Sequence, residues 1–252
     1  MILKRLGIFA AVAFVAVASI RGQDADEKEK AAIAWIEQHR GFVKRDEKQK
    51  GKPVITASFS GTRATDKDLA HVKAFPKLQN LYLRDLRKIT DEGLEHIKDL
   101  KELKYLNLTD TGITDDGLEF LAKLTALEQL NFHATDITGK GLRHLKGLTR
   151  LSEIDLSSTR MGDRNVEYLA QFEKLETLHV VDTYLTDEGL EHLDKLKSLR
   201  ELDCSWNKHI TDGGVKYLAK LTQLKRLDVF RTTISPQGRE ELRRALPKTK
   251  VD

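Results

Sequence analysis

The sequence predicts an α/β solenoid, in which a curved parallel sheet lines the concave side and short helices cover the convex side. Two observations lead to this prediction. From Val54 onward the pattern LxxLxLxxTxITDxGLxxLxxLxx recurs with a period of 24 residues, stretched to 25 in the second and seventh copies. The head of each copy alternates apolar and polar residues as a half-buried strand does, and its tail spaces leucines as a short helix does. Such a unit buries its apolar face only by stacking on its neighbours.

We expect eight repeats, which open at Val54, Leu78, Leu103, Leu127, Leu151, Leu175, Leu199 and Leu224. In this pattern the chain resembles the leucine-rich repeat proteins, and most closely the bacterial secreted proteins built from LxxLxLxxTxITDxGL units. The resemblance covers about three quarters of the chain. It implies a leucine-rich repeat solenoid that binds other molecules, and it does not name the molecule.

The N-terminus has the layout of a secretory signal peptide. Lys4 and Arg5 precede an apolar run over residues 6–17, and small residues up to Ala18 supply a cleavage site. The run is shorter than the roughly 20 apolar residues that a membrane span requires. We therefore expect residues 1–18 to be removed after Ala18, leaving an exported protein, periplasmic or extracellular, without a stable membrane anchor. Retention of the segment as an uncleaved anchor is the alternative.

The charge balance argues against a nucleic-acid partner. The formal net charge is +4 at pH 7, and it falls to +2 when Lys4 and Arg5 leave with the signal peptide. Nucleic-acid binders usually carry a basic stripe on one face, whereas the one basic concentration along this chain, Lys44 to Lys52, is diluted by acidic residues. We expect that stretch to be a solvated turn.

The single cysteine has no predicted chemical role. Cys204 occupies the sixth position of its repeat, where the other copies carry Phe, Leu or Val. A buried small hydrophobe is expected there, because a catalytic thiol needs an exposed, electropositive setting.

Residues 19–53 are expected to form a linker and an N-terminal helical cap that covers the first repeat. A helix is predicted from Asp24 to Arg40, with an apolar side that includes Trp35 and Ile36 and a stop at Gly41. An independent partner-binding helix is the alternative. Residues 54–252 are expected to form the repeat domain, and residues 224–252 are expected to be both the last repeat and a C-terminal cap with a polar outer face.

Within each repeat the fourth and sixth residues point inward, and the third, fifth and seventh point outward, because strand side chains alternate. Thr or Asn at the ninth position satisfies backbone groups of the turn after the strand. Leu86 is the exception, in a repeat of 25 residues. The Thr-Asp pair that follows supplies a helix N-cap and an acidic residue that complements the helix dipole.

Half of the eight histidines share a packing position. His71, His96, His144 and His192 occupy the eighteenth position, where other repeats carry Phe120, Tyr168 and Tyr217. A position that accepts either His or an aromatic ring is typical of side-chain packing rather than of catalysis.

The outward positions of the sheet form the candidate binding surface, where exposed aromatics among charged residues are typical anchors of a protein interface. The predicted ligand-binding residues are Tyr82, Arg84, Tyr105, Asn107, Asn131, His133, Glu153, Asp155, His179, Asp182, Asp203, Trp206, Asp228 and Phe230.

His179 also raises a catalytic hypothesis, because Asp155 and Asp203 are expected on the neighbouring strands about 4.8 Å away. Imidazole beside carboxylates can bind a divalent metal or act as a general base. An open ladder lacks the enclosed pocket that this chemistry needs. We therefore expect no catalytic residue, no metal site and no cofactor.

The leading functional hypothesis is a non-catalytic module that binds a protein or peptide ligand on its concave face. Two alternatives remain. The ITDxGL unit also resembles the repeats of F-box proteins that select substrates for ubiquitin ligases, although little sequence precedes the repeats here. The other alternative is a metal-assisted hydrolase centred on His179.

Overall fold

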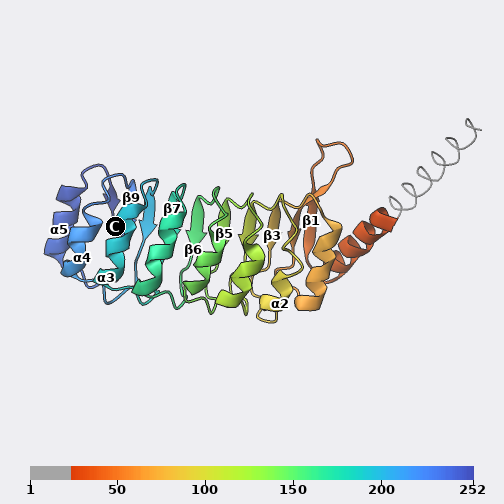
Figure 1. The fold of residues 1–252 in the computed structure, drawn as a ribbon, viewed down its shortest axis with the longest axis horizontal. Helices are drawn as coiled ribbons and strands as arrows, with labels where there is room; N and C mark the ends of the chain where they lie inside the picture. Colours follow the sequence, from red (N-terminus) through yellow and green to blue (C-terminus); the bar gives the residue numbers. More distant parts are fainter. Residues whose placement is uncertain (1–23) are drawn as a thin grey trace, which may run out of the picture.

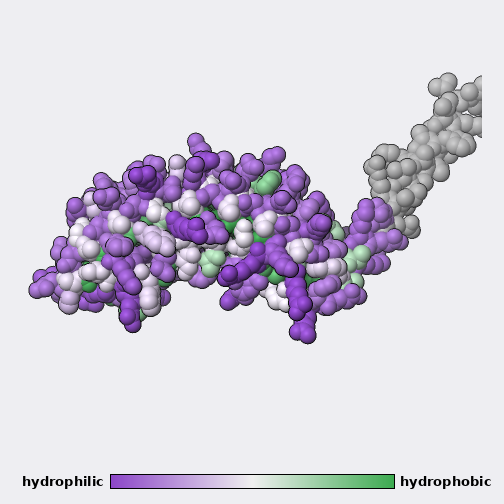
Figure 2. All heavy atoms as spheres, turned by 90° about the horizontal axis from the view of Figure 1, so that it is seen from below, coloured by the Kyte–Doolittle hydropathy of each residue, from purple (hydrophilic) through white to green (hydrophobic). Residues whose placement is uncertain are grey.

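The structure is a computed structural model that describes residues 24–252. This part of the chain has its strands side by side on one face and its helices along the other (Figure 1), and the rod is arched along its length (Figure 2). The signal peptide predicted at residues 1–18 lies outside the described residues. Within residues 24–252, no helix combines the length and the apolar character needed to cross a membrane.

Residues 24–252 form one ten-stranded sheet whose spatial order follows the sequence. Its strands are β1 (Phe42–Arg45), β2 (Val54–Ser58), β3 (Asn80–Tyr82), β4 (Tyr105–Asn107), β5 (Gln129–Asn131), β6 (Glu153–Asp155), β7 (Thr177–His179), β8 (Glu201–Asp203), β9 (Arg226–Asp228) and β10 (Lys250–Val251). From β2 to β10 each strand pairs with the next in parallel. The predicted α/β solenoid is confirmed.

The convex side carries short helices, many of them 3-10 rather than α. They are η1 (Asp66–Ala74), α2 (Asp91–Leu94), η2 (Asp115–Leu121), η3 (Lys140–Leu145), η4 (Asp163–Gln171), α3 (Asp187–Leu190), η5 (Glu191–Lys195), α4 (Asp212–Leu218) and α5 (Pro236–Ala245). Because a repeat has few residues in which to cross its convex side, the tighter 3-10 helix is common there.

The N-terminal end of the rod differs in part from the predicted helical cap. A helix covers residues 24–38, and its Trp35 ring packs against Phe59 and His71 of the first repeat. After it comes β1, which the sequence did not indicate and which pairs antiparallel with β2. β1 satisfies the edge of β2, whose backbone groups would otherwise face solvent. The expected turn is confined to the loop between β1 and β2.

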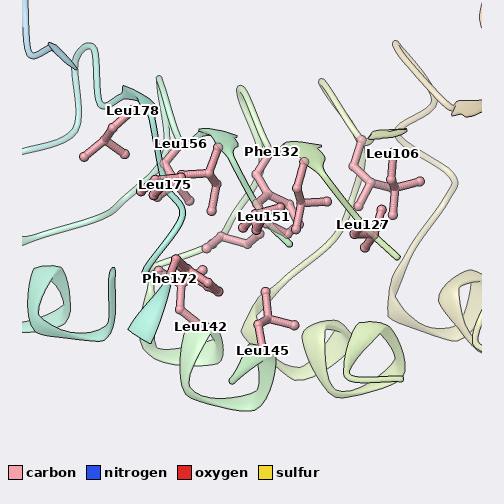
Figure 3. Packing of buried hydrophobic residues seen from close by; sticks show 14 of the residues in the cluster. Leu106, Leu127, Phe132, Leu142, Leu145, Leu151, Leu156, Phe172, Leu175 and Leu178 are labelled. Carbon is pink, nitrogen blue, oxygen red and sulfur yellow. The ribbon is translucent and has the colours of Figure 1, made fainter. Parts of the chain in front are cut away.

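The core is the continuous stack of inward side chains. Leu106 and Leu108 are fully buried and Leu130 is 2% exposed, as the alternation predicts. Figure 3 shows side chains from the strands and from the convex helices, such as Leu178 and Leu145, directed toward this interior. Cys204 lies in the same interior, where burial raises the pKa of its thiol.

The ninth-position residues close the turn after most strands. Thr111 Oγ1 donates to the carbonyl of Leu108 at 2.6 Å, and Thr135, Thr159, Thr183 and Thr232 repeat this bond. Asn207 serves its own turn by donating to the carbonyl of Cys204, and it also accepts the backbone N–H of Thr183 in the preceding repeat. The predicted role of this position is confirmed.

The aspartate of the Thr-Asp pair binds the next repeat, a role that the helix-dipole interpretation missed. Asp66 accepts the backbone N–H of Thr90 at 2.7 Å and its hydroxyl at 2.8 Å. The same two bonds, here named the Asp–Thr clamp, join Asp91 to Thr114, Asp115 to Thr138, Asp163 to Thr186 and Asp187 to Thr211. Neighbouring repeats are therefore joined by charge-assisted hydrogen bonds as well as by the core.

The clamp explains the glycine that follows it in most repeats. A Cβ on Gly117 would lie 2.2 Å from Asp91 Oδ1, and one on Gly189 would lie 2.3 Å from Asp163 Oδ1. Glycine is required because the carboxylate of the preceding repeat occupies the space of a side chain.

The two repeats that lack this glycine also lack a clamping aspartate before them. The first repeat has no predecessor, and there Asp68 stands at the glycine position and accepts the N–H and hydroxyl of Thr65. In the fifth repeat Asn165 stands at that position, because the preceding repeat carries Gly139 in place of the aspartate. Asn165 Nδ2 donates to the carbonyl of Thr138 at 2.9 Å and partly replaces the lost clamp.

Two of the packing histidines make stability depend on pH. Burial lowers the pKa of both His71 and His96 from 6.5, and Lys73 lowers that of His96 further. His71 faces Asp68, which opposes the shift, and His39. His96 Nδ1 is buried without a hydrogen-bond partner. Because the folded pKa is lowered, the unfolded chain binds more protons, so the stability they contribute is complete above pH 6.5 and is lost as the pH falls through the folded pKa.

We therefore expect a lower melting temperature at pH 5 than at pH 7.5. The double variant His71→Phe, His96→Phe keeps an aromatic ring at each position, as Phe120 does, and should show a smaller difference between the two pH values in calorimetry. An unchanged difference would contradict the assignment to these two groups.

Candidate binding surface

The outward residues of the sheet form a continuous concave floor. The strand register places the fifth-position residues in one row: Asn107, Asn131, Asp155, His179, Asp203 and Asp228. His179 thus lies between Asp155 and Asp203, as the sequence predicted. Tyr82 continues the row on β3.

Most of these fifth-position residues have a structural task that sequence analysis missed. Asp155 accepts the backbone N–H of Ser157 at 2.9 Å, and Asp203 accepts that of Ser205 at 3.0 Å. Asn107, Asn131 and Asp228 bond in the same way to the residue two positions later. This local turn satisfies a backbone group at the end of each strand.

Tyr82 and His179 are the exceptions, and the chain compensates for both. The backbone N–H of Arg84, two residues after Tyr82, donates instead to Ser60 Oγ of the preceding repeat at 3.1 Å. The N–H of Val181, two residues after His179, donates to Ser157 Oγ at 3.3 Å. A serine one repeat earlier therefore frees these two side chains from closing the turn.

The carboxylates of the floor are largely without cationic partners. Among the described residues, Glu153, Asp155, Glu201 and Asp203 form no ion pair, whereas Asp228 lies 3.7 Å from the guanidinium of Arg226. Asp155 Oδ2 accepts the Asn131 amide, and Glu153 accepts the Gln129 amide. From β6 to β8 the floor thus presents negative charge to solvent.

The residues around His179 bear on the hydrolase alternative. The carboxylates beside His179 each hold a backbone N–H of their own turn, and residues 24–252 contain no group of three His, Cys, Asp or Glu side chains arranged to hold a metal ion. The hydrolase alternative gains no support from this geometry.

The aromatic residues of the candidate surface gather at two places. Tyr82 and Tyr105 pack on the floor with ring centroids 4.9 Å apart, and burial raises the pKa of Tyr105. Trp206 and Phe230 meet edge to face at 6.4 Å, with the Arg231 guanidinium 5.2 Å from the first ring and 5.4 Å from the second. These cation–π contacts hold the second group together.

The second group lies in the turns after the strands, at the rim of the floor rather than on the floor itself. Trp206 is 46% exposed, Phe230 is 52% exposed, and Tyr184 beside them is 71% exposed. We name Tyr184, Trp206, Phe230 and Arg231 the aromatic rim. Asp182 also lies in these turns, and Arg84 pairs there with Asp85 at 3.2 Å. His133 stands at the start of such a turn, where its N–H is held by Asn131.

Sequence analysis missed Tyr184 and Arg231. Both have positive φ, 61° and 58°, like Asp182 and Trp206, and bulky residues rarely adopt this conformation. The signal was the eighth position, which is polar or small in most repeats but is Trp206 and Arg231 in the last two. Tyr184, two residues after that position, has no such signal because a solvated tyrosine looks the same in the sequence.

Two grooves run along this rim. The larger, about 500 Å³, is lined by the ion pairs Arg87–Asp110 and Asp136–Arg160 and by Asp182 and Tyr184. The smaller, about 170 Å³, shares Asp182 and Tyr184 and continues to Trp206 and His209. The two grooves together therefore lead to the aromatic rim. A third groove, about 370 Å³, lies between η1, α2 and η2 on the convex side.

Comparisons with known proteins agree with this architecture. A family model described as a leucine-rich repeat region matches residues 56–250. A search of curated proteins gives no match.

Among solved structures, internalin C2 of Listeria monocytogenes is similar over 79% of this chain and 80% of its own, with 24% identity and a TM-score of 0.61. A leucine-rich repeat protein of Leptospira interrogans is similar over 72% of this chain and 56% of its own, with 22% identity and a TM-score of 0.50. An internalin F of L. monocytogenes, at 16% identity and a TM-score of 0.44, covers 77% of this chain and 65% of its own. These likenesses concern the fold.

Proposed function

The chain belongs to the leucine-rich repeat family, and we propose that it is a non-catalytic module that holds a protein or peptide ligand on its concave floor and aromatic rim. The observation that carries the proposal is the release of Tyr82 and His179 from the turn bonds that their neighbours in the row must make. Side chains that the fold does not need are available for recognition.

The charge and the aromatic rim indicate the chemistry of the ligand. Unpaired carboxylates from β6 to β8 favour a basic segment, because opposite charges across an interface accelerate and select association. The exposed rings of Trp206 and Phe230 provide the kind of aromatic anchor that dominates many interfaces. A peptide with Lys or Arg and one apolar side chain would meet both features.

We also propose that the ligand is met outside the cytoplasm. The layout of residues 1–18 as a signal peptide supports this proposal. Mass spectrometry of the protein from envelope and cytosolic fractions tests it, with an N-terminus after Ala18 expected in the envelope fraction. Recovery of the intact N-terminus in the cytosol would contradict it and would favour the F-box-like alternative, which no observation on the described residues supports.

Binding is tested by crosslinking in the native compartment, followed by recovery of the captured partner with variant proteins. We expect the triple variant His179→Ala, Glu201→Lys, Trp206→Ala to recover the partner at least about tenfold less than wild type, because it removes one aromatic anchor and reverses one unpaired charge. None of the three side chains makes a hydrogen bond that holds a turn closed, so folding should be retained.

The control is Lys140→Ala, Glu167→Ala, Glu191→Lys, which makes the same net change in charge at exposed residues of the convex helices. It should recover the partner as wild type does. Equal recovery by both variants would mean that the concave floor and the aromatic rim do not bind the partner. Melting curves of the two proteins check that each is folded.

A further inference from the structure

Lysines and arginines that are scattered along the sequence gather on one edge of the rod. The segments that lead from each convex helix to the next strand all lie on this edge, and each contains at least one Lys or Arg. Together they hold more than twice as many basic as acidic residues. We name them the basic edge: residues 73–79, 98–104, 122–128, 146–152, 170–176, 194–200, 219–225 and 245–250.

Backbone hydrogen bonds fix these segments side by side. The N–H of Lys104 donates to the carbonyl of Gln79 at 2.8 Å, and the same bond recurs from repeat to repeat until Lys250 donates to Lys225 at 2.8 Å. With neighbouring strands about 4.8 Å apart, this row of bonds extends about 34 Å. The charge is therefore a fixed feature of the fold.

Part of this charge serves the fold. The edge contains the C-terminal ends of the helices, whose free carbonyls attract cations. Lys101 Nζ donates to the carbonyl of Lys98 at 3.1 Å, and Lys197 Nζ donates to that of Asp194 at 2.5 Å. Lys77 and Lys98 form ion pairs with glutamates.

Other cations of the edge have no such task. Lys123, Lys146, Arg150 and Lys174 are exposed in consecutive repeats, and among the described residues they form neither an ion pair nor a side-chain hydrogen bond. The sequence does not reveal this surface, because its basic residues stand about one repeat apart. The one basic concentration along the chain is a short loop.

That loop adds to the same edge. Residues 46–53 between β1 and β2 carry Lys48, Lys50 and Lys52 and lead into the start of β2. The segments of the basic edge lead into the starts of the later strands in the same way. Figure 1 shows this loop rising above turns that end at a similar level along the rod. A solenoid bends within the plane of its floor and helices, so this lateral edge can meet a flat surface along its whole length.

We propose that the basic edge docks the protein on an anionic lipid bilayer, reversibly and by charge. Lysine dominates the edge, and a flexible ammonium suits diffuse attraction to a charged surface better than recognition of one bound anion. None of the residues that line the three grooves belongs to the edge, and its charge is spread over eight segments. Docking by the edge leaves the concave floor open to a ligand.

The test is sedimentation of the full chain with lipid vesicles at low salt. The apolar segment over residues 6–17 makes binding to neutral phosphatidylcholine vesicles the baseline. Vesicles with roughly one third phosphatidylglycerol should bind wild type at least about tenfold more strongly, and this enrichment should disappear at about 0.5 M salt.

The edge variant Lys123→Glu, Lys146→Glu, Lys174→Glu should lose the enrichment, and the milder Lys→Gln variant at the same positions should lose most of it. The control is Lys67→Glu, Lys140→Glu, Arg164→Glu, which has the same net charge but changes exposed residues near the helix N-termini, and it should keep the enrichment. Equal loss in the control, no loss in the edge variant, or binding of wild type to soluble polyphosphate without enrichment on anionic vesicles would each overturn the proposal.

Discussion

Replacing Leu130 by Ala is expected to lower the free energy of unfolding by about 2–5 kcal/mol, the range for large-to-small substitutions in packed cores. Leu130 lies in the middle of β5 and is 2% exposed. Its register partners are Leu106 on β4 and Ile154 on β6, both fully buried. Because each repeat packs only against its neighbours, a cavity in a central repeat weakens the interfaces on both of its sides.

Chemical denaturation of the purified protein measures this loss. The control is His179→Ala in β7, which changes a residue of the same sheet that points to the opposite side. It should change the free energy of unfolding by less than about 0.5 kcal/mol, the usual range for surface substitutions. A large loss in the control with a small loss for Leu130→Ala would mean that the inward and outward positions are reversed.

The repeat pattern was sufficient to predict the sheet, its inward leucines and its ninth-position turns, because each depends on contacts that recur with the same side chains. Leu106 and Thr111 therefore represent the residues at the same positions in the other repeats. β1 was missed because its four residues alternate only weakly, and what makes them a strand is the open edge of β2. That requirement comes from β2, so the sequence of residues 42–45 does not reveal it.

Strand alternation predicted which side chains share the floor, and the structure gives several of them an additional role. The fifth-position acids are predicted ligand-binding residues, and Asp155 and Asp203 also hold the turns of their own repeats. The sequence does contain a signal that distinguishes the side chains that hold a turn from those that do not. Where Tyr82 and His179 interrupt the row, Ser60 and Ser157 appear at the seventh position one repeat earlier. Only the structure shows that these hydroxyls take over the missing bonds.

The role of the clamping aspartate was hidden for the same physical reason. An acidic residue in the first turn of a helix already has an explanation in the helix dipole, so nothing in one repeat requires another. The telling comparison is between repeats, because Asn165 takes the glycine position only after Gly139 has replaced the aspartate. Such paired exceptions indicate contact between residues about one period apart.

The Asp–Thr clamp leads to the second large effect, the substitution Asp115→Ala. Asp115 accepts the backbone N–H of Thr138, the Thr138 hydroxyl at 2.5 Å and the backbone N–H of Gly141 at 2.8 Å. Its removal leaves these half-buried donors without a partner. We expect the free energy of unfolding to fall by about 2–3 kcal/mol, because an unsatisfied buried group costs about 1–3 kcal/mol and bonds to a carboxylate are the stronger kind.

Asp116→Ala is the matched control for the clamp. Asp116 is the next residue of the same helix, is exposed, and its carboxylate makes no hydrogen bond within the described residues. If the helix dipole were the main reason for an acid here, both substitutions would cost similar amounts, about 0.3–1 kcal/mol each. The clamp predicts a large loss for Asp115→Ala alone in urea denaturation, and equal losses would show that the repeats are held together by their leucines without it.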